Sequence, residues 1–363
     1  DGPGALTAYR KGLVLVEVLV TRDAANAQWQ RDLSVSHNKV GDVLVAQGDE
    51  PGALAAYRKG LAIVEALVAR DAANTEWQRD LSVSHDRVGD VLVAQGDEPG
   101  AMSAYRKGLA IREALVAHDA GNTVWQRDLS ISHDKVGGML VAQGDGQGAL
   151  SAYRRGLAIA EALVARDTAN TQWQRDLSVS HNKVGDMLMA QGDGPGALAN
   201  YRKGLTIAEA LVMRDAANTV WQRDLSISHN KVGDVLVLQG DGPGALETYR
   251  RGLAIAEALV ARDSANTEWQ RDLSISNNRV GDMLMAQGDG PGALAAYRRG
   301  LAIAEALVAR DAANTQWQSD LSISHNKVGG VLMAQGDSQG ALAAYRRSLA
   351  IAEALARGSA TTE

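Results

Sequence analysis

Apolar and polar positions along this chain follow the spacing of amphipathic helices. Over 75–95, Trp77, Leu81, Val88 and Leu92 are separated by four or seven residues, which places them on one side of a helix. Polar and charged residues occupy most of the remaining positions. The pattern therefore predicts a helix of about 20 residues over this stretch.

The residues that follow carry the signals of a turn and a second helix. Gly96 stands where helices commonly end on a left-handed residue. Asp97 suits the N-cap of the next helix, and Pro99 suits its first turn, where a missing N–H costs nothing. Apolar residues then form a wide arc over 101–116, so we expect a second helix that ends near 119–122.

The same pair of segments recurs every 48 residues. The first helix of the second unit opens on a capping box formed by Thr75 and Gln78, and we expect the threonine to be the N-cap; a threonine stands at this position in every unit except the first, which has Ala27. One tryptophan marks each repeat: Trp29, Trp77, Trp125, Trp173, Trp221, Trp269 and Trp317. One tyrosine keeps the same step: Tyr9, Tyr57, Tyr105, Tyr153, Tyr201, Tyr249, Tyr297 and Tyr345.

A fixed period of this length predicts a repeat array as the fold. Short connections make consecutive helices antiparallel, and stacked hairpins bury apolar faces that one hairpin alone would expose. We therefore expect an all-α solenoid that forms a single array over 1–363. Its units run 1–48, 49–96, 97–144, 145–192, 193–240, 241–288 and 289–336, with a half unit at 337–363.

Each unit contains a pattern that resembles the tetratricopeptide repeat. The matching positions in one unit are His85, Val88, Gly89, Leu92, Gly96, Ala101, Tyr105 and Gly108. The usual repeat has 34 residues, so both helices here would be extended, as in long bacterial arrays of this type. The resemblance implies a right-handed superhelix of helix hairpins whose first helices line the concave side and hold extended peptides.

Composition narrows the class of partner. The 37 basic and 43 acidic residues are spread evenly, which argues against nucleic acid and against a membrane surface. No apolar run approaches the ~20 residues needed to span a bilayer. There is no cysteine, which is typical of a reducing compartment, so we expect a cytoplasmic protein. The chain begins in mid-repeat, and we expect it to be a fragment of a longer array.

No residue pattern indicates catalysis, a metal or a cofactor. An active site needs one asymmetric set of groups, whereas carboxylates such as Asp86 and Asp90 recur in unit after unit. One histidine per unit offers too few ligands for zinc, and we expect it to be half-buried and hydrogen-bonded within its hairpin. We expect the tryptophans to belong to the core rather than to a stacking ladder. Arg112 interrupts an apolar arc, either by extending along a groove to solvent or by making a local contact.

The resemblance places a candidate peptide-binding surface on the first helices, in four rows. An amide or carboxylate row comprises Asn38, Asp86, Asp134, Asn182, Asn230, Asn278 and Asn326. A second row comprises Asp42, Asp90, Asp186, Asp234 and Asp282, with Gly138 and Gly330 at the remaining positions. An apolar row comprises Val45, Val93, Val141, Met189, Val237, Met285 and Met333. An arginine row comprises Arg31, Arg79, Arg127, Arg175, Arg223 and Arg271.

Three interpretations of these rows remain open. The leading one is a non-catalytic scaffold that binds a protein or peptide segment, including one from its own parent chain. In the second, the arginine and aspartate rows pair with each other, and the array is a spacer without a ligand. In the third, apolar surface at the two terminal helices, 1–22 and 338–357, drives end-to-end self-association.

Overall fold

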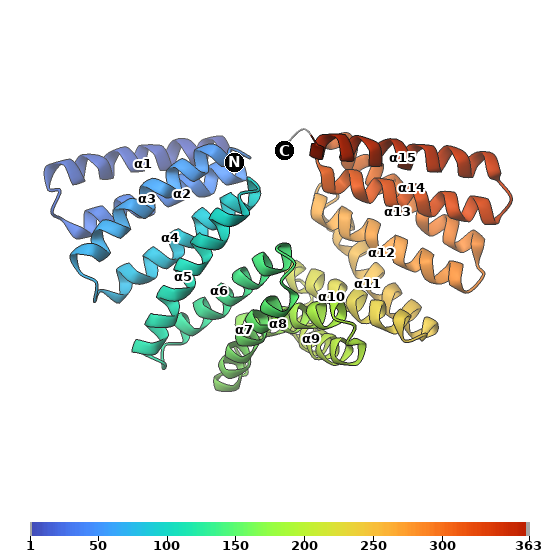
Figure 1. The fold of residues 1–363 in the computed structure, drawn as a ribbon, viewed down its shortest axis with the longest axis horizontal. Coiled ribbons are helices and arrows are strands. Elements are labelled where there is room, and N and C mark those ends of the chain that lie inside the picture. The colour runs from blue at the N-terminus through green and yellow to red at the C-terminus, as the bar shows by residue number, and fades with distance from the viewer. Residues whose placement is uncertain (1, 361–363) are drawn as a thin grey trace. The chain divides into compact units, whose positions relative to one another are not determined.

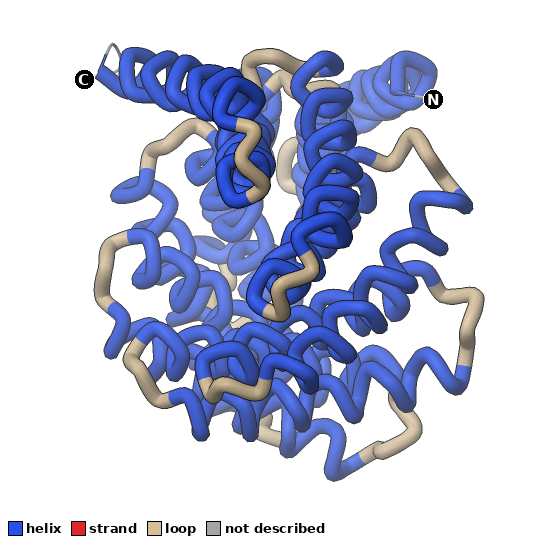
Figure 2. Tube along the Cα trace, turned by 90° about the vertical axis from the view of Figure 1, so that its right-hand side faces the viewer, coloured by secondary structure: helices blue, strands red, loops and turns tan. Residues whose placement is uncertain are grey.

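The computed structural model describes residues 2–360, with side chains described from Gly4 to Arg357. The described residues form helices joined by short loops and contain no strand (Figures 1 and 2). The helices are α1 Gly2–Arg22, α2 Ala27–Ala46, α3 Glu50–Arg70, α4 Thr75–Ala94, α5 Glu98–His118, α6 Thr123–Ala142, α7 Gly146–Arg166, α8 Thr171–Ala190, α9 Gly194–Arg214, α10 Thr219–Leu238, α11 Gly242–Arg262, α12 Thr267–Ala286, α13 Gly290–Arg310, α14 Thr315–Ala334 and α15 Ser338–Ala360.

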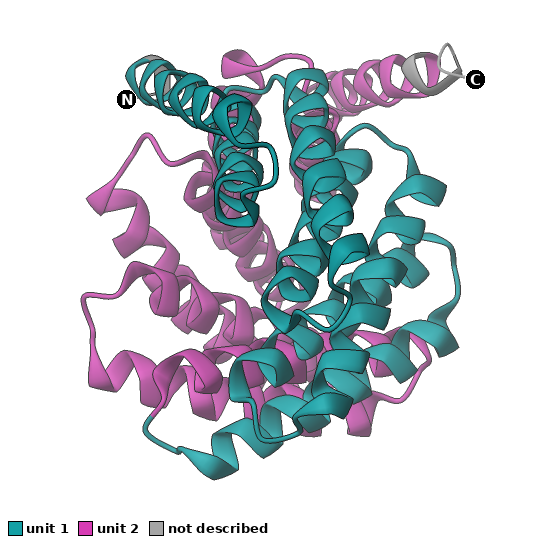
Figure 3. Ribbon diagram, turned by 90° about the vertical axis from the view of Figure 1, so that its left-hand side faces the viewer, with its two compact units in different colours: residues 1–169 teal, residues 170–363 magenta. Residues whose placement is uncertain are grey.

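The chain divides after Ala169 into two compact units (Figure 3). The first contains α1 to α7 and the second contains α8 to α15. Asp1 and residues 361–363, which the sequence assigns to the first unit and to the final half unit, lie outside the described residues. A single array over the whole chain stays a prediction.

Within each compact unit, every even-numbered helix packs against the odd-numbered helices that precede and follow it in that unit; α8, which begins the second unit, packs against α9. Each even helix has 20 residues, and the odd helices α3 to α13 each have 21, as the apolar pattern predicts. Seven glycines at the ends of the even helices have positive φ angles, 76° at Gly96. This left-handed residue turns the chain back, and Asp97 then caps the following helix by accepting a hydrogen bond from the Gly100 N–H.

The N-cap of the even helices lies one residue earlier than the capping box predicts. Asn74 has extended backbone, and its side-chain oxygen accepts from the Trp77 N–H at 3.1 Å. Thr75 is the first helical residue instead. Asparagine is among the strongest N-cap residues because its short side chain reaches the exposed N–H groups of the first turn. The neighbouring asparagine therefore takes the position that we assigned to the threonine.

Small residues and one tyrosine form the core of each odd helix. Ala53, Tyr57 and Leu67 are buried in α3, and their equivalents are buried in the odd helices up to α13. The tryptophans differ from the prediction, because all seven are only partly buried and none joins the buried core. They lie in the first turn of each even helix, near the loop end of the hairpin, where fewer neighbours surround them.

Mid-helix glycines allow the two helices of a hairpin to approach closely. A Cβ atom at Gly89 would lie 2.6 Å from the Tyr105 ring, and one at Gly108 would lie 3.2 Å from the Ser82 carbonyl oxygen. Glycine costs about 1 kcal/mol relative to alanine inside a helix. A Cβ atom at either position would clash with the other helix of the hairpin, and this clash outweighs the cost of glycine. The expected close approach is therefore confirmed.

Candidate binding face

The rows predicted from the sequence lie on the even-numbered helices, and we call their common surface the even-helix face: α2, α4 and α6 in the first compact unit, and α8, α10, α12 and α14 in the second. Successive even helices contact one another directly, α2 with α4, and α8 to α14 in series. Side chains on this face therefore bridge neighbouring repeats, and most of the predicted residues take part in such bridges.

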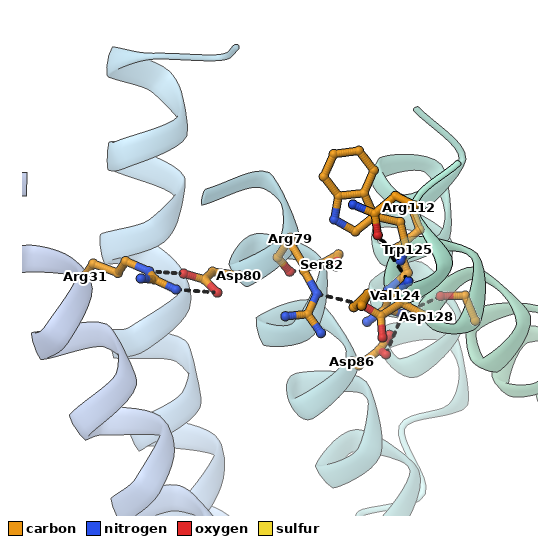
Figure 4. Close-up of polar contacts among 11 residues, drawn as sticks. Arg31, Arg79, Asp80, Ser82, Asp86, Arg112, Val124, Trp125 and Asp128 are labelled. Atoms are coloured by element: carbon orange, nitrogen blue, oxygen red, sulfur yellow. Dashed lines mark hydrogen bonds and ion pairs between the residues drawn. The ribbon is translucent and has the colours of Figure 1, made fainter. Parts of the chain in front are cut away.

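Within each compact unit, the arginine row joins successive even helices. Arg31 Nε donates to Asp80 Oδ2 at 2.5 Å, and Arg79 Nε donates to Asp128 Oδ2 at 2.7 Å (Figure 4). The same pairing, 49 residues apart, recurs from Arg175, Arg223 and Arg271. Each aspartate directly follows the next arginine of the row, except Asp320, which follows Ser319.

The second aspartate row is held from two sides. In one repeat, the Tyr249 hydroxyl donates to Asp234 Oδ1 at 2.7 Å, and Arg279 of the next even helix pairs with the same carboxylate at 2.8 Å. The cation also lies over the tyrosine ring, 6.0 Å from its centroid. Equivalent groups centre on Asp42, Asp90, Asp186 and Asp282.

These carboxylates remain open to solvent, with side-chain exposures of 34% to 52%. The tyrosines behind them are buried, and burial followed by the hydrogen bond to aspartate raises the pKa of Tyr249 far above its ordinary value. The hydroxyl therefore stays protonated and continues to donate. The arrangement holds both carboxylate oxygens of Asp234 and still leaves the group partly exposed.

The amide row is mostly buried between repeats. Asn182 Nδ2 donates to Ser228 Oγ at 3.1 Å, and Asn230 and Asn278 repeat this bond one and two units later. Their side-chain oxygens point at the mid-helix glycine of the hairpin: Asn230 Oδ1 lies 3.0 Å from the Cβ position of Gly252. Only Asn326, on the last even helix, is exposed among the described members of this row.

Arg112 makes a local contact and does not extend to solvent. Its side chain is 4% exposed, and Nη1 donates to Asp86 Oδ2 at 2.7 Å and to Ser132 Oγ (Figure 4). Asp86 occupies the position of Asn182, and Ser132 occupies the position of Ser228. The arginine thus supplies the donor that the aspartate lacks.

The apolar row is the most open part of the face. Val45, Val93, Val141, Val237 and Met333 are 37% to 50% exposed, whereas Met189 and Met285 are half-buried. Val35 and Ile323, two turns or more before the row, are exposed as well. These side chains lie beside charged groups that already have partners within the array.

Small hollows recur on this face between successive even helices. One of about 220 Å³ lies between α2 and α4 and includes Asn38, Asp80 and Arg87 in its lining. Another of about 120 Å³ lies between α10 and α12, where the equivalent residues are Asn230, Asp272 and Arg279. The two hollows are four repeats apart in sequence, so the same small site occurs once in each compact unit.

The histidine row contributes to packing. His85 and its equivalents at 37, 133, 181, 229 and 325 are buried, and His181 Nδ1 lies 3.1 Å from Asn200 Oδ1 of the same hairpin. Burial, followed by the charge of Lys107, lowers the pKa of His85 to about 4. In the described part of the chain, no group of three His, Asp or Glu side chains has the geometry of a metal site. No described helix is long and apolar enough to cross a membrane.

Two sets of partners were missed at the level of sequence. These are the aspartates at 80, 128, 224, 272 and 320, and the cations at 87, 135, 231, 279 and 327. The separations of 49 and 45 residues are close to one repeat, which is the signal that would have identified them. The predicted pairing of the arginine row with the Asp42 row is therefore wrong in its partners, although both rows are paired.

No protein-family model matches the chain, and no curated protein is significantly similar to it. Solved structures share the fold. Aspartyl phosphate phosphatase F from Bacillus subtilis is similar over 92% of this chain and 74% of its own, with a TM-score of 0.60 and 12% identity. The apo form of RapI is similar over 89% and 99%, with a TM-score of 0.56 and 14% identity. A Rap protein complexed with competence and sporulation factor is similar over 97% and 86%, with a TM-score of 0.53 and 14% identity.

These likenesses and the alternating helices establish the fold class. The chain is a tetratricopeptide-like α-solenoid of antiparallel helix hairpins, as the 48-residue pattern predicts. Identities of 12% to 14% extend the likeness to fold and no further.

Proposed function

We propose that this array is a protein-interaction scaffold whose even-helix face binds an extended peptide or a segment of a partner protein. The observation that carries the proposal is the exposed apolar row Val45, Val93, Val141, Val237 and Met333 beside half-exposed aspartates. Apolar contact supplies affinity, and carboxylate oxygens accept hydrogen bonds from a peptide backbone.

The ion pairs between successive even helices support this proposal because they hold the side chains of the face in place. Because Arg31, Arg79 and their equivalents are paired with the next repeat, a ligand meets a surface whose side chains are already ordered. The equivalent hollows between α2 and α4 and between α10 and α12 can each accept a small side chain of such a ligand. A similar fold in the Rap protein complexed with competence and sporulation factor is consistent with a peptide ligand.

A pulldown with the chain as bait tests the proposal. Changing Val93, Val141 and Val237 to Glu places charge in the apolar row without touching a paired residue. Val124 and Val220 lie in the first turns of α6 and α10, are 51% and 50% exposed, and provide a Val→Glu control outside the row. We expect the row variant to lose the captured protein and the control to keep it. Equal capture by both would exclude the even-helix face.

End-to-end self-association is a second candidate, favoured by the terminal helices. Leu15 of α1 is exposed, and Tyr9 is 43% exposed, whereas Tyr57 at the same position in α3 is 4% exposed. Leu342 and Leu349 are exposed on α15. Light scattering over a range of concentrations tests this candidate, since a monomer at every concentration rules it out.

A further inference from the structure

A row of unpaired arginines runs along the odd-numbered helices. Each odd helix carries an arginine directly after the repeat tyrosine, and all eight side chains are exposed. The structure gives none of these described side chains an ion pair or a hydrogen bond, in contrast to the arginines of the even-helix face. We call this set the odd-helix row: Arg10, Arg58, Arg106, Arg154, Arg202, Arg250, Arg298 and Arg346.

A second exposed cation follows each member of the row, for example Lys107 after Arg106. Glu247 is the only acidic residue three or four positions away from any of these cations, and it pairs with Arg251. The nearly equal numbers of acidic and basic residues in the whole sequence hide this cluster of positive charge on the odd helices. The acidic residues lie mostly in the loops and on the even helices. Each odd helix therefore presents two cations to solvent side by side.

Apolar hollows adjoin the row at equivalent positions. One of about 680 Å³ includes Pro291, Leu294, Arg298 and Gln335 in its lining. Another of about 500 Å³ lies four repeats earlier in sequence, where the equivalent residues are Pro99, Met102, Arg106 and Gln143.

A third hollow, of about 650 Å³, lies at the same position on α1, beside Arg10, Lys11 and Val14. An arginine of the row and apolar residues thus line all three hollows, and Ser103, Lys107 and Gln143 make the second hollow more polar. The hollows lie beside the odd helices and share no residue with the small hollows of the even-helix face, although Met285 of α12 and Val331 of α14 also line the first of them.

Exposed arginines beside these hollows favour an acidic peptide over a nucleic acid as the ligand. A guanidinium pairs with a carboxylate, and an adjoining apolar hollow accepts an aliphatic side chain. Single-stranded nucleic acid also needs aromatic side chains on which bases stack. The row lacks them, since the preceding tyrosines, apart from Tyr9 and the half-buried Tyr345, are buried. An acidic peptide with interspersed aliphatic residues fits both parts of the site.

We propose that the odd-helix row and its hollows form a second binding surface, which takes an acidic, aliphatic-rich peptide segment of a partner protein. Carboxylates of the segment pair with successive arginines, and its aliphatic side chains enter the hollows beside them. The arginines of this row lie outside the even-helix face, and the two surfaces adjoin at Met285, which belongs to the apolar row and also lines the first hollow.

Fluorescence anisotropy with a labelled peptide of alternating Glu and Leu tests the proposal. The test variant changes Arg58, Arg106, Arg154, Arg202, Arg250 and Arg298 to Gln. A matched control changes Arg22, Arg70, Arg166, Arg214, Arg262 and Arg310 to Gln, which removes the same charge from the last turns of the odd helices. Circular dichroism verifies that both variants keep their helicity.

We expect the row variant to bind the peptide at least about tenfold more weakly than the unaltered chain, and the control to stay within about twofold. We also expect labelled oligoglutamate and a DNA duplex to bind more weakly than the Glu–Leu peptide. Failure of the unaltered chain to bind that peptide overturns the proposal, as does an equal loss in both variants. Oligoglutamate or DNA binding as tightly as the peptide overturns it too, because the hollows would then contribute nothing.

Discussion

The guanidinium of Arg112 lies 2.7 Å from the carboxylate of Asp86, and both groups are buried between α4, α5 and α6. Burial alone raises the pKa of Asp86, and the facing arginine opposes this rise. In most other repeats the equivalent positions hold asparagine and alanine, as in Asn182 and Ala208, while one repeat combines Asn38 with Val64 and another combines Asp134 with Ala160. One repeat thus replaces an amide and a methyl group with an ion pair.

Removing one partner of this pair should be much more harmful than removing both. We expect Arg112→Ala to lower the free energy of unfolding by ~3–5 kcal/mol, because Asp86 is left buried without a counter-charge. The double variant Asp86→Asn, Arg112→Ala should recover to within ~1 kcal/mol of the original chain, or exceed it. Urea unfolding of the two single variants and the double variant measures the coupling. Additive effects would show that the pair is not an energetic unit.

Two glycines at the same repeat position should respond to alanine in opposite ways. A Cβ at Gly252 would lie 3.0 Å from Asn230 Oδ1 and 3.1 Å from the Ser226 carbonyl oxygen, whereas Gly12 has no such neighbour within 4 Å. We expect Gly252→Ala to destabilise the array by ~1–3 kcal/mol through overpacking. Gly12→Ala should stabilise α1 by ~1 kcal/mol through helix propensity. Hydrogen exchange of the two helices measures both effects, and the same sign at both sites would contradict the close-approach argument.

Replacing Gly330 with aspartate should stabilise the last hairpin. The repeats centred on Asp234 and Asp282 place a carboxylate at this position, next to a tyrosine hydroxyl. Here the Tyr345 hydroxyl lies 3.8 Å from the Cβ position of Gly330. Gly330→Asp should therefore stabilise the last hairpin by ~0.5–1.5 kcal/mol beyond Gly330→Ala, through one new hydrogen bond. The alanine variant isolates helix propensity, and equal melting of the two variants would refute the expected bond.

Acid should weaken the array through its buried histidines. The pKa values of His85 and His229 are lowered from 6.5 to about 4, first by burial and then by Lys107 and Arg251. Their neutral forms are favoured in the fold, so this stability is complete above pH 6.5 and is lost as the pH falls toward 4.

Asparagine provides the control for this pH dependence, because Asn277 already fills the same register. The double variant His85→Asn, His229→Asn should show a smaller loss of unfolding free energy between pH 6.5 and 4 than the original chain. Carboxylates titrate in both proteins, so the difference between the two curves isolates the histidines. Superimposable curves would mean that the histidines are not the titrating groups.

The helices and turns were predictable from sequence because their signals are local. Gly96 and Asp97 end and begin helices by the conformation of their own residues, and the 48-residue period multiplies each signal. The N-cap was displaced by one residue because Asn74 and Thr75 are both good caps. Only the backbone conformation decides between two such neighbours.

The contacts of the candidate face were harder to predict because they join different repeats. Helical spacing places Arg79 and Asp90 on one side of α4 but does not show how far along the next helix each side chain reaches. The structure pairs Arg79 with Asp128, and Asp90 with Tyr105 and Lys135. The odd-helix row was overlooked because total charge was counted over the whole chain, which averages the basic helices with the acidic loops.

The contacts between even helices join residues that are about one repeat apart, so whole repeats can be removed or added without loss of these contacts. Arg175 pairs with Asp224, 49 residues on, and Asn182 bonds to Ser228, 46 residues on. If residues 193–240 were deleted, Asp272 and Ser276 would take these two places, and both bonds would re-form with unchanged chemistry. Recombination between repeats can therefore shorten or lengthen the gene in steps of one unit, and each product retains the contacts that hold its neighbours together.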